Sequence, residues 1–302
     1  MVDLWIPLTV AAALIQTARS VWQRKLAGRV SVISTTYARF FYGAPIALVM
    51  LLIAVVVTGD QLFMPPAAFV GYMIVAGIAQ VLGNALFIHL IRASNFAVMT
   101  TFAKMETVLS ALFSFLLVGD TMNPAGIGGI VVALLGVMTL AAAREERSIG
   151  AFLAACTRRP ALSGMAVGAL YAVSSTSFRA GALLLEPLSF VVRGLTELAW
   201  VTVLQTVAMG LYLLWTQPAA LRETVREWRL AARTGLAGAL ATGCWLSAFA
   251  LQKTGYVLAV GQIELVFATI AGHMLLKERM NRAEIAGIGL TLIGILLAAL
   301  AG

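Results

Sequence analysis

Apolar residues fill long, almost unbroken stretches of this chain, and short polar segments separate them. A helix needs about 20 residues to cross the ~30 Å of hydrocarbon in a bilayer, because each residue adds about 1.5 Å. The stretches have this length and are apolar on nearly all sides, as expected for helices that face lipid or each other. The pattern therefore predicts ten transmembrane helices, at residues 4–23, 31–58, 66–91, 96–118, 124–143, 161–184, 188–215, 232–252, 256–276 and 282–301.

Helix-breaking residues mark the short connections: Gly59-Asp60, Pro65-Pro66, Gly119-Asp120, Glu186-Pro187 and Gln217-Pro218. The longest connection is rich in arginine and separates five spans from five. We therefore expect a first five-helix repeat at 1–147, a cytoplasmic linker at 148–160 and a second repeat at 161–302. One further segment, Leu221–Arg233, has arginines at helical spacing and predicts a short helix on the anionic membrane surface.

Two segments of the chain resemble each other. Residues 104–137 and 262–295 match without a gap at 11 of 34 positions, and their separation of 158 is about half of the chain. An odd number of spans in each half forces the two copies to insert with opposite orientation. Inverted repeats are typical of alternating-access transporters, which bind substrate near the bilayer midplane. Arg39 of the second span and Arg193 of the seventh are expected at matching places in the two repeats.

Composition and charge placement support an all-α membrane protein. The chain is 61% hydrophobic and only 11% charged, whereas soluble domains carry about 25% charged residues. The connections after the odd-numbered spans hold 15 lysines and arginines, the other connections hold only Lys253, and the termini hold none. The positive-inside rule then places the odd-numbered connections in the cytoplasm and both termini outside the cytoplasm. We expect the protein in the inner (plasma) membrane. The net charge of +8 is thus topological and does not indicate a nucleic-acid partner.

The repeat carries a carboxylate inside an apolar run in each copy, Glu106 and Glu264. A charged group at the bilayer centre costs about 2.5–3.5 kcal/mol on insertion scales, so it must face a wet cavity, find a partner or stay protonated. A carboxylate that gains and loses a proton would serve a proton-coupled carrier. The alternative is a structural ion pair or hydrogen bond that locks the repeat interface.

Other intramembrane charges surround this pair in sequence. Five cations and three carboxylates lie within spans. The cations are Arg19, Arg39, Lys104, Arg179 and Arg193, and the carboxylates are Glu106, Glu197 and Glu264. The excess of positive charge suits a substrate with an anionic group, which Arg39 and Lys104 would attract. Arg193 and Glu197 are four apart and are expected to pair. Lys104 and Glu106 are two apart, so a bridge between them is not expected.

Polar and aromatic side chains supply further candidates for a substrate cavity. Those we select as substrate-binding residues, beside the charges, are Gln16, Asn84, Tyr171, Trp245 and Gln262. Each could instead join helices through hydrogen bonds or packing. His89 and His273 form no ligand pattern, so we expect no metal or other cofactor. The glycines of spans five and ten indicate close packing within the chain, which favours a monomer over a dimer.

Spans four and nine end in LLVGD and LLKER, and each is followed by a glycine-rich span. With ten spans in two halves, the chain resembles the EamA family of the drug/metabolite transporter superfamily. The resemblance implies exporters of amino acids, other small metabolites or drugs, with a central cavity lined by spans one, three, four, six, eight and nine. It places the family's acidic residues at Asp120 and Glu278. Thr107 and Leu265 stand where many members have proline.

These observations predict a secondary active transporter that exports small metabolites by alternating access, in which Glu106 and Glu264 couple protons or help to bind a substrate amine. A passive facilitator or a lipid-headgroup flippase on the same fold is the alternative. An enzyme is not expected, because the spans contain no nucleophile–base set or metal cluster. The expected partners are a small-molecule substrate, protons and the lipid bilayer.

Overall fold

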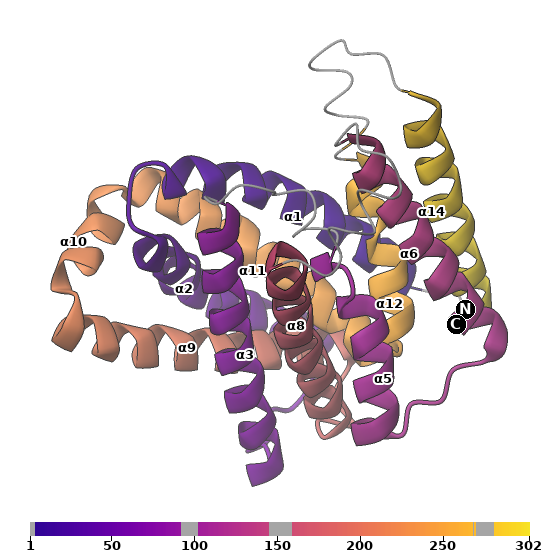
Figure 1. Cartoon of the computed structure of the whole chain (residues 1–302). Helices are drawn as coiled ribbons and strands as arrows, with labels where there is room; N and C mark the ends of the chain where they lie inside the picture. The colour runs from indigo at the N-terminus through magenta and orange to yellow at the C-terminus, as the bar shows by residue number, and fades with distance from the viewer. Residues whose placement is uncertain (1–3, 92–101, 145–158, 268, 270–280) are drawn as a thin grey trace. The chain divides into compact units, whose positions relative to one another are not determined.

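The computed structural model describes residues 4–91, 102–144, 159–267, 269 and 281–302, and these residues form α-helices joined by short turns (Figure 1). Contacts between helices divide the chain into two compact units. Unit 1 comprises Met1–Ile88 and Ser177–Leu251, and unit 2 comprises His89–Thr176 and Gln252–Gly302. Each unit therefore combines helices from both of the expected sequence repeats.

Unit 1 is built around two long helices, α2 and α9. Its elements are α1 (Trp5–Ala27), α2 (Val32–Thr58), most of α3 (Ala67–Ile91), the end of α8 (Arg159–Leu183), α9 (Phe190–Thr216), α10 (Pro218–Arg226) and α11 (Trp228–Leu251). α11 packs against α1, α2 and α9, and α2 also packs against α9. The side chains of Ser31 and Ser189 cap the first turns of α2 and α9 by accepting hydrogen bonds from backbone N–H groups. A capping serine thus determines where each of the two long helices begins.

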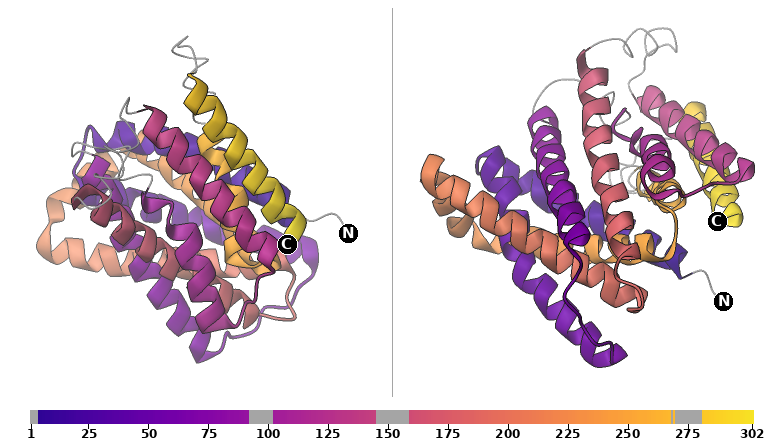
Figure 2. Two further views of the ribbon diagram at one scale, coloured as in Figure 1. Left: turned by 45° about the vertical axis from the view of Figure 1, so that its right-hand side comes forward. Right: turned by 90° about the horizontal axis from the view of Figure 1, so that it is seen from below.

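Unit 2 contains a close pair of helices, α6 and α14. Its elements are α5 (Glu106–Val118), α6 (Pro124–Arg144), the first part of α8, α12 (Thr254–Gly261) and α14 (Arg282–Ala301). α6 and α14, the magenta and yellow helices of Figure 2, lie side by side. A Cβ atom on Gly136 would lie 2.3 Å from the backbone nitrogen of Thr291, and one on Gly294 would lie 2.2 Å from that of Ala133. This confirms close packing within the chain at Gly136 and Gly294, whereas Gly128 and Gly289 have no atom within 4 Å of the place where a Cβ would lie.

The described helices confirm a multi-pass membrane protein. Six of them are long and apolar enough to cross a membrane, and shorter apolar helices accompany them. The expected breakers Gly59 and Gly119 end α2 and α5 with positive φ angles of 72° and 78°, which glycine adopts easily. Parts of the spans expected at 96–118 and 256–276 lie outside the described residues, so the count of ten stays a prediction.

Two details differ from expectation. The surface helix was expected at Leu221–Arg233, but α10 ends at Arg226 and the next helix begins at Trp228, so Arg229 belongs to α11. The alignment of the two repeats also differs from the one that pairs Arg39 with Arg193. α2 and α9 begin 158 positions apart, as do α6 and α14, so this offset holds beyond the segments that match in sequence.

The common offset changes which residues correspond. Arg39 is the eighth residue of α2, and its counterpart, the eighth residue of α9, is Glu197 and not Arg193 as expected. The cap serines Ser31 and Ser189 fix this alignment, because each begins its helix. The repeats therefore place opposite charges at equivalent positions.

Candidate functional site

In unit 2, the two segments that carry the repeated glutamates lose regular helical geometry beside them. Around Lys104 and around Gln262, backbone hydrogen bonds span three residues instead of four: Met105 to Phe102, Thr107 to Lys104, Gln262 to Ala259 and Leu265 to Gln262. These two positions are 158 apart, so the irregularity is itself repeated. Tight turns inside a helix often mark functional hinges. Neither segment needs a proline for its turn.

An ion pair joins the two repeats at these turns. The Nζ atom of Lys104 lies 3.3 Å from Oε2 of Glu264, with 22% and 17% of the two side chains exposed. Glu106 lies close enough for its carboxyl group to interact electrostatically with both of them. Lys104 pairs with the glutamate of the other repeat and not with Glu106, as expected from their spacing. In the part of the chain that the structure describes, this cluster comprises the carboxyl groups of Glu106 and Glu264 and the ammonium group of Lys104.

Neutral hydrogen-bonding groups line the helices next to this cluster. Nε2 of Gln262 donates to Oγ1 of Thr107 at 2.7 Å, which gives a second polar contact between the repeats. Ser110 on α5 and Ser175 on α8 share a hydrogen bond of 3.0 Å between their hydroxyl groups. Tyr171 also lies on α8 and is half-buried. Unit 2 thus brings together polar groups from α5, α8 and the segment after α12.

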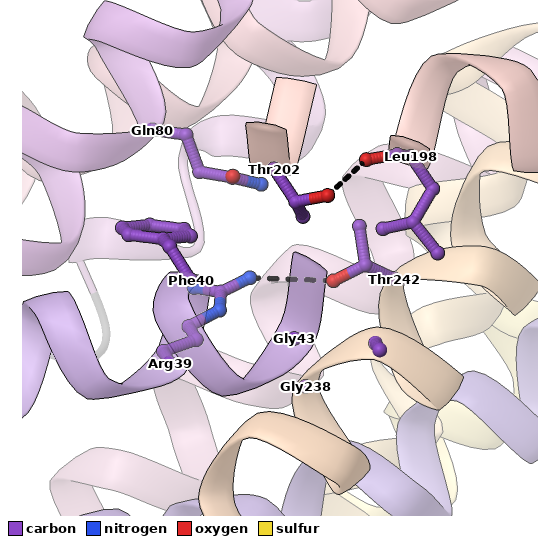
Figure 3. Close-up of a pocket in the computed structure, with 9 residues that line it drawn as sticks. Arg39, Phe40, Gly43, Gln80, Leu198, Thr202, Gly238 and Thr242 are labelled. Carbon is purple, nitrogen blue, oxygen red and sulfur yellow. Dashed lines mark hydrogen bonds between the residues drawn. The ribbon is translucent and has the colours of Figure 1, made fainter. Parts of the chain in front are cut away.

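Unit 1 contains a small pocket with a cavity volume of about 10 Å³, about enough for one water molecule (Figure 3). Its lining residues are Arg39, Phe40, Gly43, Gln80, Leu198, Thr202, Gly238, Ala239 and Thr242. Arg39 is only 7% exposed, and its guanidinium donates to Oδ1 of Asn84 at 3.4 Å and to Oγ1 of Thr242 at 3.3 Å. The Phe40 ring lies 5.4 Å from the guanidinium carbon. The pocket therefore presents a buried cation held by neutral oxygens.

Asn84, on α3, connects this arginine to α1 and to a second residue of α2. Its Oδ1 also accepts from Nε2 of Gln23 on α1 at 3.2 Å, and its Nδ2 donates to Oγ1 of Thr36 at 3.4 Å. The repeat offset makes Thr242 the counterpart of Asn84, so both partners of Arg39 occupy equivalent places. Thr242 is not among the candidates that the sequence pattern suggests. The fixed offset of 158 is the signal that identifies it.

The predicted site residues divide between the two units. Lys104, Glu106, Gln262 and Glu264 lie together in unit 2, with Tyr171 on α8. The unit 1 candidates are Gln16, Arg39, Asn84, Arg193 and Trp245. Nε1 of Trp245 donates to Oε1 of Gln16 at 3.2 Å, which joins α11 to α1.

The expected pair between Arg193 and Glu197 is wrong. NH1 of Arg193 donates instead to Oε1 of Glu186 at 3.2 Å. Glu186 lies in the turn before α9, and its side chain extends to the first turn of α9, where Arg193 lies. Asp120, one of the acidic positions implied by the resemblance, accepts a hydrogen bond from the Ser114 hydroxyl at 2.7 Å. Glu278 and His273 lie outside the described residues.

Repeated apolar helices, a repeated turn and intramembrane ion pairing define a multi-pass membrane protein with two related halves. Residues 3–142 and residues 161–300 each match the EamA-like transporter family, and the chain belongs to this family. It is also similar in fold to a protein of known crystal structure, with a TM-score of 0.70, 16% sequence identity, and coverage of 98% of this chain and 97% of that one. No curated protein sequence matches the chain.

Proposed function

We propose that this protein is a secondary active transporter that exports small metabolites, such as amino acids or related organic compounds, by alternating access. The observation that carries the proposal is the ion pair between Lys104 and Glu264 at two turns that the repeat duplicates. Irregular helices at repeat interfaces are where secondary transporters bind substrates and coupling ions. Membership of a transporter family favours transport over catalysis.

Proton coupling follows from the charges of the cluster. Among the described residues, Lys104 is the cation that acts on Glu106 and pairs with Glu264, so within this set ionising both glutamates leaves one negative charge in excess. Like charges disfavour the doubly ionised state, and a proton or a substrate amine relieves it. When Glu264 takes up the proton, its ion pair with Lys104 is lost and the ammonium group becomes available to an anionic substrate group. Proton binding and substrate binding are thereby linked.

The pocket of unit 1 supports a substrate with an anionic group. Arg39 presents a guanidinium to the pocket, and guanidinium groups bind carboxylates with two parallel hydrogen bonds. An apolar wall from Phe40 and Leu198 accompanies it. An amino acid or a related organic acid combines these two features, and the pocket must widen to admit one, because it has room for about one water molecule in this structure.

The test is transport by the purified protein in liposomes, with an amino-acid, amine and organic-anion panel and with or without an imposed pH gradient. We expect the gradient to accelerate transport of a substrate with an anionic group in the wild type. Glu264→Gln and Glu106→Gln should each reduce this acceleration by about 5- to 150-fold, the range of typical coupling energies. Glu284→Gln is the matched control, because glutamine also suits this capping position at the start of α14. Normal gradient-driven transport by both folded variants would show that the cluster is structural.

A second function is favoured by the pocket alone. A passive facilitator or a lipid-headgroup flippase would need the Arg39 guanidinium to bind an anionic group but would not need the ion pair of unit 2. Such a protein would transport its substrate equally well without a pH gradient, or would move a labelled lipid between leaflets. Loss of that movement in Arg39→Gln, with Glu264→Gln unaffected, would favour this function.

A further inference from the structure

A third intramembrane carboxyl group lies in unit 1, outside the pocket lining and far in sequence from the Lys104–Glu264 pair. Glu197 on α9 is 0% exposed. Among the described residues, neither of its carboxyl oxygens hydrogen bonds to another side chain, although the backbone N–H of Ala182 approaches them. A Cβ atom on Gly181 would lie 2.7 Å from both Oε1 of Glu197 and Cε of Met73. The carboxyl group is thus packed against the end of α8 and an apolar side chain of α3.

Two charged groups act on Glu197, Arg193 on the same helix and Arg179 on α8. Both guanidinium groups direct hydrogen bonds elsewhere: Arg179 donates to the backbone oxygens of Phe249 and Ala250 at 2.8 and 3.3 Å, and Arg193 donates to Glu186. Among the described residues, the Nε atom of Arg193 is buried and makes no hydrogen bond. Other charged side chains on helices packed against α9 exert no resolved electrostatic effect on the Glu197 carboxyl group. They are Arg39 on α2, Arg222, Glu223 and Arg226 on α10, and Arg229 and Arg233 on α11.

These contacts favour a neutral Glu197 in this conformation. Removing an ionised carboxylate from water costs several kcal/mol unless good hydrogen bonds and a close counter-ion replace the water. The guanidinium that could pair with Glu197 from the same helix face is instead bonded to Glu186, whose side chain is 67% exposed. Arg193 therefore has two carboxyl groups within reach, one at the solvent-exposed turn and one in the core.

We propose that Glu197 is a proton-binding site of unit 1, and that Arg193 exchanges Glu186 for Glu197 when the proton leaves. A spacing of four residues places Arg193 and Glu197 on the same face of α9, so the exchange needs only a change of side-chain rotamer. In the protonated state Arg193 bonds to Glu186, as in this structure. On deprotonation the proton passes to water that reaches the Glu186 turn, and Arg193 pairs with the ionised Glu197.

The repeat register supports a role for this position. Glu197 is the counterpart of Arg39, which lines the pocket of the same unit. A residue retained only to fill space at this position in α9 would be apolar, since an unpaired buried carboxyl group destabilises a helix bundle. The proposal does not depend on coupling at Glu264, because the proton is detected on Glu197 itself.

The experiment is infrared spectroscopy of the full-length protein in lipid nanodiscs, which detects the C=O stretching band of protonated carboxyl groups. We expect the wild type at neutral pH to show a component of this band that shifts in heavy water and is lost in Glu197→Gln; a component from the unit 2 cluster is distinguished by its loss in Glu106→Gln or Glu264→Gln. Glu106→Gln and Glu264→Gln are the matched comparisons and should retain the Glu197 component. An unchanged band in Glu197→Gln would overturn the proton site. If that variant does not fold, Glu197→Asp should move the band, and an unmoved band would have the same negative meaning.

Glu186→Gln tests the exchange of partners without touching the core. Removing the exposed carboxylate frees Arg193 to stabilise ionised Glu197, so the Glu197 band should lose roughly half or more of its intensity at neutral pH. An undiminished band in this variant would show that Arg193 does not exchange partners. Loss of transport coupling in Glu264→Gln, with the Glu197 band intact, would separate this site from the cluster of unit 2.

Discussion

Glu223 is one of the residues that fix the short helix α10 to the start of α2, beside Ala220 and Thr224. Its Oε2 atom accepts a hydrogen bond from the Ser34 hydroxyl at 2.6 Å and another from the backbone N–H of Ser31 at 2.9 Å. These bonds, the Ser34 hydroxyl first, lower the pKa of Glu223 below its ordinary value of 4.5. The ionised form is thus bound more strongly in the folded protein than in the unfolded chain.

This contact predicts a pH-dependent contribution to stability. Because the folded-state pKa is lowered, the stabilisation is fully present above about pH 4.5 and is lost as the pH falls through the lower, folded-state value. We expect Glu223→Gln to lower the free energy of unfolding by about 1–2 kcal/mol at neutral pH and to cost nothing at strongly acid pH. Thermal unfolding in detergent at both pH values measures this.

The neighbouring Glu227 provides the control for this prediction. Its side chain pairs with Arg29 at 3.1 Å, but 63% of the Arg29 side chain is exposed. Exposed pairs contribute about 0–1 kcal/mol, so Glu227→Gln should have the smaller effect at neutral pH. Equal destabilisation by both substitutions, or a Glu223→Gln effect that persists at acid pH, would contradict the assigned role of Glu223.

The sequence predicts the hydrogen-bond and ion-pair partners of individual site residues less well than any other part of the site. The repeat indicates that Glu106 and Glu264 correspond, and the spacing indicates that Lys104 does not pair with Glu106. It does not show that Lys104 bonds to Glu264, because that contact joins residues 160 apart. The local rule for pairs four residues apart fails at Arg193, where the turn before α9 supplies a competing carboxylate.

At the scale of elements, the contact between α6 and α14 depends on the absence of side chains at specific positions. Gly136 faces the backbone of α14, whereas Gly128, on the same helix, has no atom within 4 Å of the place where a Cβ would lie. We expect Gly136→Ala to destabilise the protein by about 1–3 kcal/mol, because the helices must separate to admit the methyl group. Unfolding in detergent, followed by circular dichroism, measures the change.

Gly128→Ala is the matched control in the same helix. Alanine at a free helical position should leave stability unchanged or raise it by up to about 1 kcal/mol, because glycine loses more conformational freedom on folding. If the two alanine variants behaved alike, close packing of α6 on α14 would not be what positions these helices.

The helices themselves follow from the sequence, but the turns inside two of them do not. Length, apolarity and capping residues predict the long helices to within a few residues, as at α2, which runs from Val32 to Thr58. The turns at Lys104 and Gln262 have no proline and no glycine at the turn residue itself. They arise where polar groups of different helices meet, so they depend on tertiary contacts that a local pattern does not contain.

At the scale of the whole molecule, sequence repeats and compact units divide the chain differently. Each repeat is continuous in sequence, yet each unit draws helices from both, because closely packed helix pairs such as α6–α14 and α1–α11 join one repeat to the other. The offset of 158 positions between corresponding residues nevertheless holds in both units. It is therefore the register, and not the boundary at residues 148–160, that identifies corresponding residues such as Arg39 and Glu197.

Orientation in the membrane is the property of the whole chain that charge placement predicts. Basic residues gather in the connections after the odd-numbered spans, including α10, and the connection that contains Met64 has none. The surface of the inner leaflet attracts such residues, and insertion retains them on that side. We therefore expect α10 in the cytoplasm, and the turn around Met64 and the C-terminus outside.

Single cysteines test this arrangement in a variant whose natural cysteines, Cys156 and Cys244, are replaced by alanine. Met64→Cys and Gly302→Cys should react with a membrane-impermeant maleimide in intact cells, because the Met64 side chain is 80% exposed and Gly302 ends the chain. Arg222→Cys on the exposed face of α10 should react only after the membrane is opened. The reverse pattern would place both termini in the cytoplasm and α10 outside. In that case the turn at Glu186 would also face the cytoplasm, and protons would reach Glu197 from that side of the membrane.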